Sequence, residues 1–464
     1  SGEPGHDADK GEAGAYYVYA GLDSNNNPLN LTGSGTDLGA IDYDASLDWL
    51  KVDPLDINSL IPSRLNFNVS ESDATAIGGM IAMNDARGEV RARVAEANVK
   101  STTGNIEVLA TENASIDVHN VGNVKADGGS FFKGGGTTLA VNALIATNLV
   151  QSTADATIQY SDLDAVAGAI NVTANNTAKI DSDIDMETIA EGAGSSIGVG
   201  VTLAFNSIGV ESQNFLFNTI DALFGLLPAD EVPTMATASV ISTDMTAETG
   251  IAVDANSQMM IEADIINAAL ATSVSLDDNS AVTVAPIIAL NKGSAGAVAL
   301  ISGSDTVQTA TGDIAVTADD TSTIHAEVKS AAASLAVGTG KSTSVAVAVS
   351  FARNVLRTSV DAGILASGLV NPVEATTGEI KVSAVRNGSI EAISRAVAAT
   401  LSVSATSGNS IAVSVGGASA INRLYGSADA SIEDSELSVD EVTIEAKSAS
   451  KIDAEVIAVA ASAS

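Results

Sequence analysis

The 464-residue sequence contains no cysteine, and only 3% of its residues are aromatic. The lack of cysteine excludes disulfides, thiolate metal sites and cysteine nucleophiles. Because aromatic side chains are scarce while hydrophobic residues still make up 45% of the chain, a core must consist of alanine, valine, isoleucine and leucine. Such small side chains favour narrow, tightly layered β structure over a wide globular core.

Basic residues are also scarce, since 21 lysine and arginine residues stand against 57 aspartate and glutamate residues, for a formal net charge of −36. No nucleic acid partner is expected, because phosphate contacts need clustered basic side chains. The charge disfavours an anionic membrane surface, and the lack of long apolar runs predicts no membrane insertion. A strongly acidic chain instead favours solubility and the binding of divalent cations.

What the sequence does contain is one pattern repeated six times. In every copy an alternating stretch ends on an alanine, and an isoleucine follows six residues later. A glycine opens the stretch in five copies. Self-similarity at a fixed spacing, here roughly 64 residues, is typical of stacked repeat architectures. The alanine and isoleucine pairs are Ala110/Ile116, Ala174/Ile180, Ala255/Ile261, Ala318/Ile324, Ala384/Ile390 and Ala446/Ile452.

The second half of each repeat is a valine- and alanine-rich stretch that leads to an asparagine. In five copies an alanine follows this asparagine by eight residues and an isoleucine or valine follows it by ten. The sixth copy has the same context before its asparagine, but an insertion comes after it. The asparagines are Asn84, Asn148, Asn206, Asn291, Asn354 and Asn422.

Nearly every periodic stretch alternates with period two, which predicts an all-β fold. We expect a repetitive β-solenoid, or parallel β-helix, over residues 67–464, with about six repeats of roughly 64 residues. The last repeat is expected to be truncated, because the sequence stops within the pattern. Residues 1–66 fall outside the pattern and are expected to form an N-terminal non-repeat module and linker.

One segment has helical rather than strand periodicity. Its apolar residues recur at the spacing of one helix face and are followed by a proline, which predicts a short amphipathic helix within an insertion at 211–233. This helix would either cap or flank the solenoid, or dock a partner. The apolar residues are Leu216, Ile220, Leu223 and Leu227.

The sequence leaves open how many layers one repeat forms. The residue after the anchoring isoleucine is acidic in five of the six copies, so carboxylates in adjacent layers, about 4.8 Å apart, would repel one another without a cation between them. Three layers per repeat would separate the carboxylates by roughly 14 Å, beyond the Debye length of about 8 Å. The charge pattern therefore favours three layers, whereas the recurring asparagine favours one, because an asparagine ladder joins adjacent layers.

The densest acidic cluster is Asp181, Asp183, Asp185 and Glu187. Alternation places all four side chains on one face of a strand. They are candidate Ca²⁺ ligands, since clustered carboxylates suit that ion. The alternatives are a solvated acidic face and a catalytic carboxylate pair. Because no nucleotide-binding or hydrolase motif occurs in the sequence, we expect no catalytic residue, no cofactor beyond Ca²⁺ and no enzyme activity.

The repeat resembles that of very large bacterial filamentous adhesins of the leukotoxin type. The resemblance is carried by GDIAVTADDTSTIHA at 312–326, by VAVAVSFARN at 345–354 and by SVDAGI at 359–364. A tyrosine-rich stretch near the start is similar to a short module that recurs between repeats in such proteins, and the whole resemblance covers roughly residues 17–464. The residues of that module are Tyr17, Tyr19, Gly21, Asp42, Tyr43, Asp48 and Trp49.

The resemblance implies a secreted or surface-anchored β-solenoid without an enzymatic role, located outside the cell or on the bacterial cell surface. We therefore expect a structural and adhesive segment, a rigid repeat stalk that supports attachment. Its expected partners are other copies of itself or the rest of a longer repeat chain, and a cell-surface glycan or protein. The alternatives are a self-assembling extracellular filament or sheath subunit and a carbohydrate-active β-helix enzyme.

Overall fold

The chain divides into two compact units, Ser1–Asn68 and Val69–Ser464. In the first unit, β1 (Tyr16–Tyr19) pairs antiparallel with β2 (Trp49–Val52). All described elements are β-strands, which confirms the all-β class, and the described residues contain no helix that could cross a membrane. The helix expected within 211–233 lies outside the described residues. The computed structural model describes residues 16–19, 49–52, 73–129, 135–210, 233–405 and 409–464.

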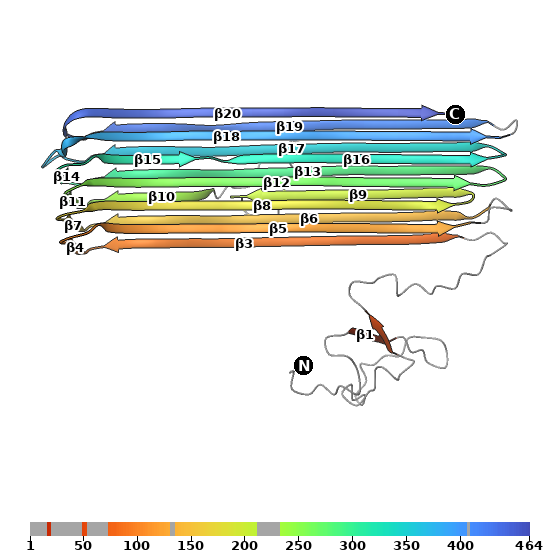
Figure 1. Ribbon diagram of the computed structural model, residues 1–464, viewed down its shortest axis with the longest axis horizontal. Helices are drawn as coiled ribbons and strands as arrows, with labels where there is room; N and C mark the ends of the chain where they lie inside the picture. Colours follow the sequence, from red (N-terminus) through yellow and green to blue (C-terminus); the bar gives the residue numbers. More distant parts are fainter. Residues whose placement is uncertain (1–15, 20–48, 53–72, 130–134, 211–232, 406–408) are drawn as a thin grey trace. The chain divides into compact units, whose positions relative to one another are not determined.

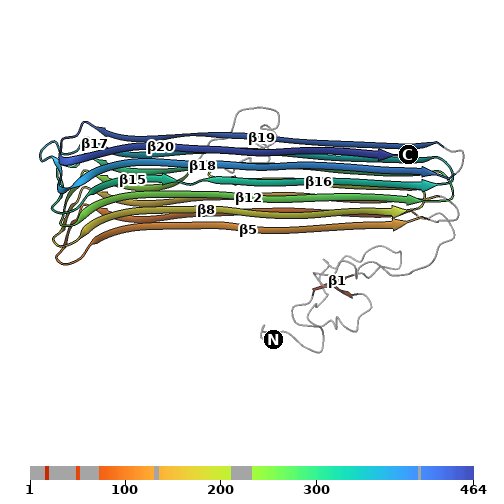
Figure 2. The ribbon, with the colours of Figure 1, turned by 45° about the horizontal axis from the view of Figure 1, so that its top comes forward.

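The second unit consists of two sheets of long parallel strands, together with a narrow row of short strands at one end (Figure 1). The chain alternates between the sheets, so that each layer contributes to both, with one long strand or with two shorter strands in succession (Figure 2). The first sheet contains β3 (Ala74–Ala95), β6 (Thr137–Gln159), β9 (Ser195–Ile208), β10 (Thr234–Ile241), β13 (Asn279–Ser302), β17 (Ser342–Leu365) and β19 (Ser410–Glu433). The second sheet contains β5 (Ile106–Gly128), β8 (Ala169–Gly192), β12 (Gly250–Val274), β15 (Ile314–Asp320), β16 (Thr323–Gly338), β18 (Val373–Ser404) and β20 (Leu437–Ala463). The short strands are β4 (Asn98–Ser101), β7 (Asp162–Ala165), β11 (Asp244–Ala247) and β14 (Val307–Thr309).

Each repeat forms one wide layer. Ile180 pairs with Ile116 of the preceding repeat and with Ile261 of the following one. The anchoring alanines and the asparagines pair in the same way, so the repeat alignment made from the sequence is the register of the sheets. The preference for three layers per repeat is therefore wrong, while the long parallel sheets are those of a β-solenoid.

The interior changes in composition from one end of the layers to the other. Near the short strands, three sides enclose isoleucine and valine side chains such as Ile170, Val253 and Ile314. At the far end only the two long sheets remain, and the hydrophobic residues buried between them are all alanine, together with buried serine and threonine. A Cβ built on Gly198 of the first sheet would lie 3.1 Å from the carbonyl oxygen of Leu270 in the second. Close approach of the two sheets thus explains why the core needs alanine and few aromatic residues.

A ladder of asparagines crosses all the layers inside the first sheet. Each Nδ2 donates to the Oδ1 of the next asparagine along the chain, over distances of 2.8 to 2.9 Å. The inner members are at most 1% exposed. Leaving a buried amide unpaired costs about 1–3 kcal/mol, so the ladder opposes any slip in register between layers. Its members, in order, are Asn84, Asn148, Asn206, Asn291, Asn354 and Asn422.

A proline in the middle of the first sheet is compensated from across the interior. Pro286 lies in β13 and has no N–H to donate to the neighbouring strand β9, and the pairing of the two strands is interrupted there. Asn267 of the second sheet donates its Nδ2 to the carbonyl oxygens of Gly200 (2.9 Å) and Pro286 (3.2 Å). The side chain thereby supplies a donor where the proline removes one.

The corner after each first-sheet strand has a left-handed backbone. The residue at this corner has a φ between 46° and 66° in every layer, although its identity changes from layer to layer. The next corner, where a second-sheet strand begins, has glycine for a different reason: a Cβ on Gly168 would collide with the carbonyl oxygen of Gly104 in the preceding layer. The left-handed residues are Glu96, Tyr160, Ser242, Gly303, Ala366 and Asp434.

Replacing Asn291 with leucine, which has a similar volume, should lower the free energy of unfolding by about 2–4 kcal/mol. The substitution leaves Asn206 without an acceptor and Asn354 without a donor. Denaturant unfolding followed by circular dichroism measures the change. Asn256→Leu is the matched control, because Asn256 also donates to an asparagine of an adjacent layer, Asn175, at 3.0 Å, but is exposed. Equal losses in the two variants would contradict a special role for the buried ladder.

Candidate functional site

The acidic cluster lies on the outer face of β8, as alternation predicts. Asp181 is half-buried, and Asp183, Asp185 and Glu187 are exposed. Because each repeat is one layer, these side chains belong to columns that cross the second sheet, one residue per layer. The arrangement therefore depends on what the adjacent layers place beside each carboxylate.

Lysine separates the carboxylates in the first of these columns. The Nζ of Lys179 lies 3.0 Å from a carboxylate oxygen of Asp181 in its own layer and 3.0 Å from one of Glu262 in the next layer. Hydrogen bonds to Asp181 and Glu262 raise the pKa of Lys179 to about 12. The positive charge therefore stays in place at neutral and moderately alkaline pH, where the carboxylates are ionised.

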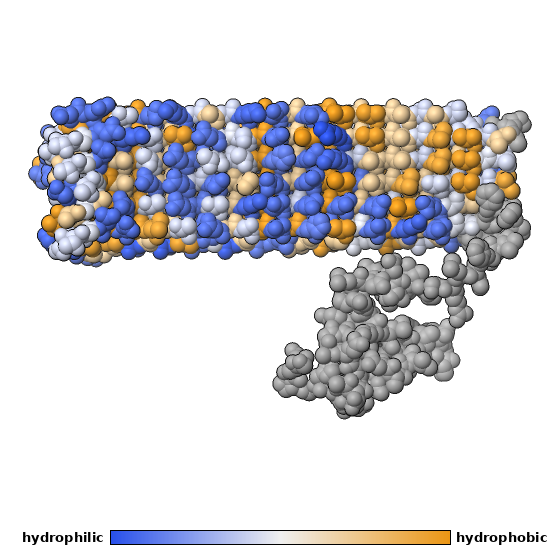
Figure 3. Space-filling model, in the orientation of Figure 1, coloured by the Kyte–Doolittle hydropathy of each residue, from blue (hydrophilic) through white to orange (hydrophobic). Residues whose placement is uncertain are grey.

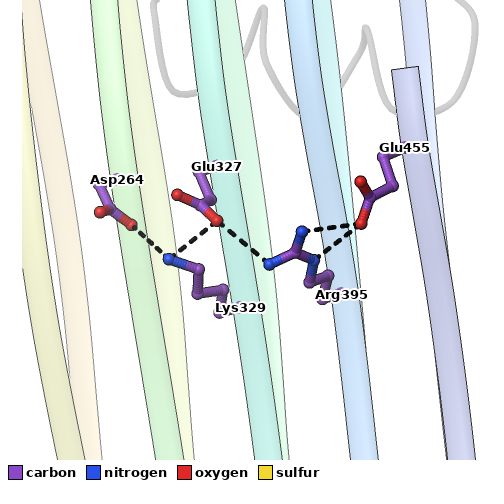
Figure 4. Close-up of polar contacts among 5 residues, drawn as sticks. All are labelled: Asp264, Glu327, Lys329, Arg395 and Glu455. Atoms are coloured by element: carbon purple, nitrogen blue, oxygen red, sulfur yellow. Dashed lines mark hydrogen bonds and ion pairs between the residues drawn. The ribbon is translucent and has the colours of Figure 1, made fainter.

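The next column continues as a chain of ion pairs across four layers (Figure 4). Lys329 Nζ lies 2.9 Å from Glu327 and 3.9 Å from Asp264. Arg395 lies 3.6 Å from the same glutamate and 2.8 Å from Glu455. Hydrogen bonding to Glu455 raises the pKa of Arg395 above its ordinary value.

Histidines occupy the places at which the acidic columns are interrupted. His119 Nδ1 lies 2.9 Å from Asp183, and His325 Nδ1 lies 3.4 Å from Glu391, each pair joining adjacent layers. The repulsion that favoured three layers per repeat is reduced by Lys179, Lys329 and Arg395, which lie between carboxylates on the same face. Pairs such as His119–Asp183 cannot be recognised in the sequence until the register is known, since the two residues are 64 positions apart.

The four acidic residues have polar and apolar neighbours rather than a common centre. Glu187 accepts a hydrogen bond from Asn123 at 3.1 Å, while Val121 and Ile266 flank Asp185 in the adjacent layers. Within the part of the chain that the structure describes, no three histidine or acidic side chains converge as metal ligands would. Calcium binding at Asp181, Asp183, Asp185 and Glu187 stays a prediction.

The interior holds one charged pair that the sequence analysis did not single out. Asp320 is fully buried at the end of β15, and its pairing partner in the next layer, Arg386, is 2% exposed. One carboxylate oxygen of Asp320 accepts from Ser322 at 2.7 Å, and the other has no hydrogen-bond partner. Burial raises the pKa of Asp320 to about 6. Arg386 donates to Thr358, Tyr425, Ser448 and Ser450.

The outer face of the first sheet is apolar along the first half of its strands. We define the apolar face as the four outward columns headed by Thr75, Ile77, Gly79 and Ile81 of β3. None of their members is charged. The only sequence signal for the apolar face was that hydrophobic residues occupy both the inward and the outward positions of these strands. Columns of like hydropathy also cross the layers on the side of the unit seen in Figure 3. The remaining members are Leu139, Val141, Ala143, Ile145, Ile197, Val199, Val201, Leu203, Val282, Val284, Pro286, Ile288, Val345, Val347, Val349, Phe351, Val413, Val415, Gly417 and Ser419.

Replacing Lys179 with methionine should lower the melting temperature in EGTA by about 1–2 °C, because Asp181 and Glu262 would then repel each other without a cation between them. Millimolar CaCl₂ should recover part of this loss in the variant. Lys381→Met, on the same face, is the control and should change the melting temperature less. The same assay tests the calcium prediction in the unmodified chain. If Ca²⁺ is bound, EGTA should lower the melting temperature of the chain by several degrees, and an unchanged value would refute the prediction.

Asp320 should make the chain less stable as the pH rises. Its folded-state pKa of about 6 lies above the ordinary value of 3.8, so the folded state binds this proton more tightly and its stabilising effect is lost between pH 4 and pH 6. Asp320→Asn removes the titration, and the stability of the variant relative to the unmodified chain should increase by about 2 kcal/mol from pH 4.5 to pH 7.5. Denaturant unfolding at the two pH values measures this change. Asp117→Asn, at an exposed position, should show no such trend.

Comparison with protein-family models, with curated proteins and with solved structures gives no match for this chain. The resemblance to leukotoxin-type adhesins therefore rests on the repeat residues alone, and the function that it implies is a proposal.

Proposed function

We propose that the chain is a structural and adhesive segment of a secreted bacterial surface protein, located outside the cell. The observation that carries the proposal is the common register, in which equivalent residues of six repeats pair in adjacent layers. A body in which every layer is hydrogen-bonded to the next along most of its length suits load-bearing and display rather than conformational change.

The dimensions of one layer indicate which property of the segment matters. A repeat of roughly 64 residues adds only about 4.8 Å along the stacking direction, whereas a strand of 24 residues is about 80 Å long. The repeats therefore add little length per residue along the stacking direction. The proposal instead rests on the two broad, rigid faces of the stack. The partners that fit are the rest of a longer repeat chain and a cell-surface glycan or protein.

The proposal assigns no catalytic role to any residue. Asp183 and His119 form the carboxylate–imidazole pair that comes nearest to a catalytic arrangement, but their side chains are 53% and 65% exposed. Strong perturbation of pKa values is expected where carboxylates act as acid or base, and the one strongly raised carboxyl pKa belongs to the buried Asp320 among the described residues. These features support a structural role.

Electron microscopy of the purified chain tests the proposal. We expect rigid plates about 80 Å long in the strand direction, and incubation with polysaccharides should leave the length of the sugars unchanged. Cleavage of a polysaccharide that is abolished by Asp183→Asn or Asp185→Asn would overturn the proposal in favour of a carbohydrate-active enzyme.

A second candidate, a self-assembling filament or sheath subunit, is favoured by the two ends of the stack. Val442, Ile444 and Ile452 of β20 point inward but are 46 to 51% exposed, whereas their equivalents in β18 are buried. The last layer consists of β19 and β20 and the first consists of β3 and β5, so end-to-end stacking would pair β19 with β3 and β20 with β5 of the next copy. The asparagine ladder has a matching polarity, since Asn422 presents Nδ2 at one end and Asn84 presents Oδ1 at the other.

Removal of residues 447–464 tests this second candidate. If copies join end to end, with β20 of one copy on β5 of the next, concentrated protein should form filaments, and the truncated chain should form none while keeping its circular dichroism spectrum. Ala449→Lys, on the outward side of β20, is the control and should still form filaments. Filaments that persist after the truncation would exclude pairing through this strand.

A further inference from the structure

We propose that the apolar face of the first sheet packs against the same face of a second copy of this chain, forming a face-to-face dimer. This inference goes beyond the proposed function and does not depend on it, because the apolar face is separate from the two ends of the stack. It rests on the size of the face, on its lack of charge, on its flatness and on the charges at its border.

The apolar face has the area of a stable interface. Four columns two residues apart span about 27 Å and six strands span about 29 Å, so the face covers about 800 Å². A standard protein interface buries roughly 800 Å² on each partner, and monomeric proteins rarely expose so large a contiguous apolar surface without a function for it. Ile77 and Val415, in the two end strands, are 75% and 49% exposed, while inner members such as Val284 are half-buried.

A second copy is the partner whose surface has the same spacing. The strands are nearly straight and lie side by side (Figures 1 and 2), and flat sheets of many strands are commonly stabilised by stacking on another sheet. In both faces the strands are about 4.8 Å apart, so the valine and isoleucine side chains of the two copies can interdigitate as they do between facing sheets. The chain carries a net charge of −36, and an uncharged face is where two copies can meet with least repulsion.

The charges at the border of the face select one orientation. Asp85 of β3, which also accepts two hydrogen bonds from Arg87 of its own strand, and Arg423 of β19 belong to the same outward column, at opposite ends of the stack, and both are exposed. A two-fold axis parallel to the strands places each column opposite the same column of the second copy, with the layers in reverse order. It therefore places Asp85 of one copy opposite Arg423 of the other, and the same contact occurs twice in the dimer.

Sedimentation equilibrium of the full chain at 1–100 µM tests the proposal. We expect twice the monomer mass for the unmodified chain, and monomers for Val284→Lys/Val347→Lys, which puts two charges at the centre of the face. Ile266→Lys/Ile393→Lys is the matched control, since these outward residues lie on the second sheet, and it should remain dimeric. Circular dichroism and melting curves establish that both double variants are folded.

Reversal of the border charges tests the orientation. Arg423→Asp should raise the dissociation constant of the dimer by about threefold to tenfold, because two contacts with Asp85 become repulsive. Adding Asp85→Lys should restore most of the affinity. Failure of this restoration would refute the two-fold arrangement.

Three results would overturn the dimer itself. The unmodified chain could remain monomeric at 100 µM, Val284→Lys/Val347→Lys could leave the dimer intact, or a monomeric chain could float with neutral phosphatidylcholine vesicles through this face. Removal of residues 447–464 separates this inference from end-to-end assembly, since the truncated chain should lose filaments and keep the face-to-face dimer.

Discussion

The hydrogen bond from one buried asparagine to the next is the interaction on which the rest of the structure depends. In a stack of nearly identical layers, alanine and valine columns would tolerate a shift of two residues with little change in burial. The amides do not, because each one donates to the layer after it and accepts from the layer before it. With this register fixed, the isoleucines coincide, the lysines fall between carboxylates and the apolar face becomes continuous.

Much of the fold could be predicted because the repeats align without ambiguity. The spacing from Ala318 to Ile324, and its recurrence, gave the register of the second sheet, and Asn354 with its equivalents gave that of the first. Alternation correctly placed Ile314, Val316 and Ala318 inside. The placement of Asp181 to Glu187 on one outer face followed from the same rule.

The number of layers per repeat could not be predicted, because the charge balance of an acidic column depends on cations in the neighbouring columns. Lys179 and Lys329 belong to other columns and reach sideways to the carboxylates. The left-handed corners were also hidden, since glutamate, tyrosine, serine, alanine and aspartate have no shared preference for that conformation. The apolar face was missed because its valine and isoleucine residues alternate with small buried residues. The sequence pattern alone does not show which of the two alternating sets faces outward.

The change from an isoleucine-rich interior to one of alanine, serine and threonine affects how the layers can open. An alanine buries far less apolar surface than an isoleucine, while the backbone hydrogen bonds between layers are the same at both ends. Local opening should therefore start at the alanine end, with amide exchange fastest there and slowest beside the short strands. The layers would then separate first at the alanine end and stay joined at the other end, where the chain turns through its left-handed corners.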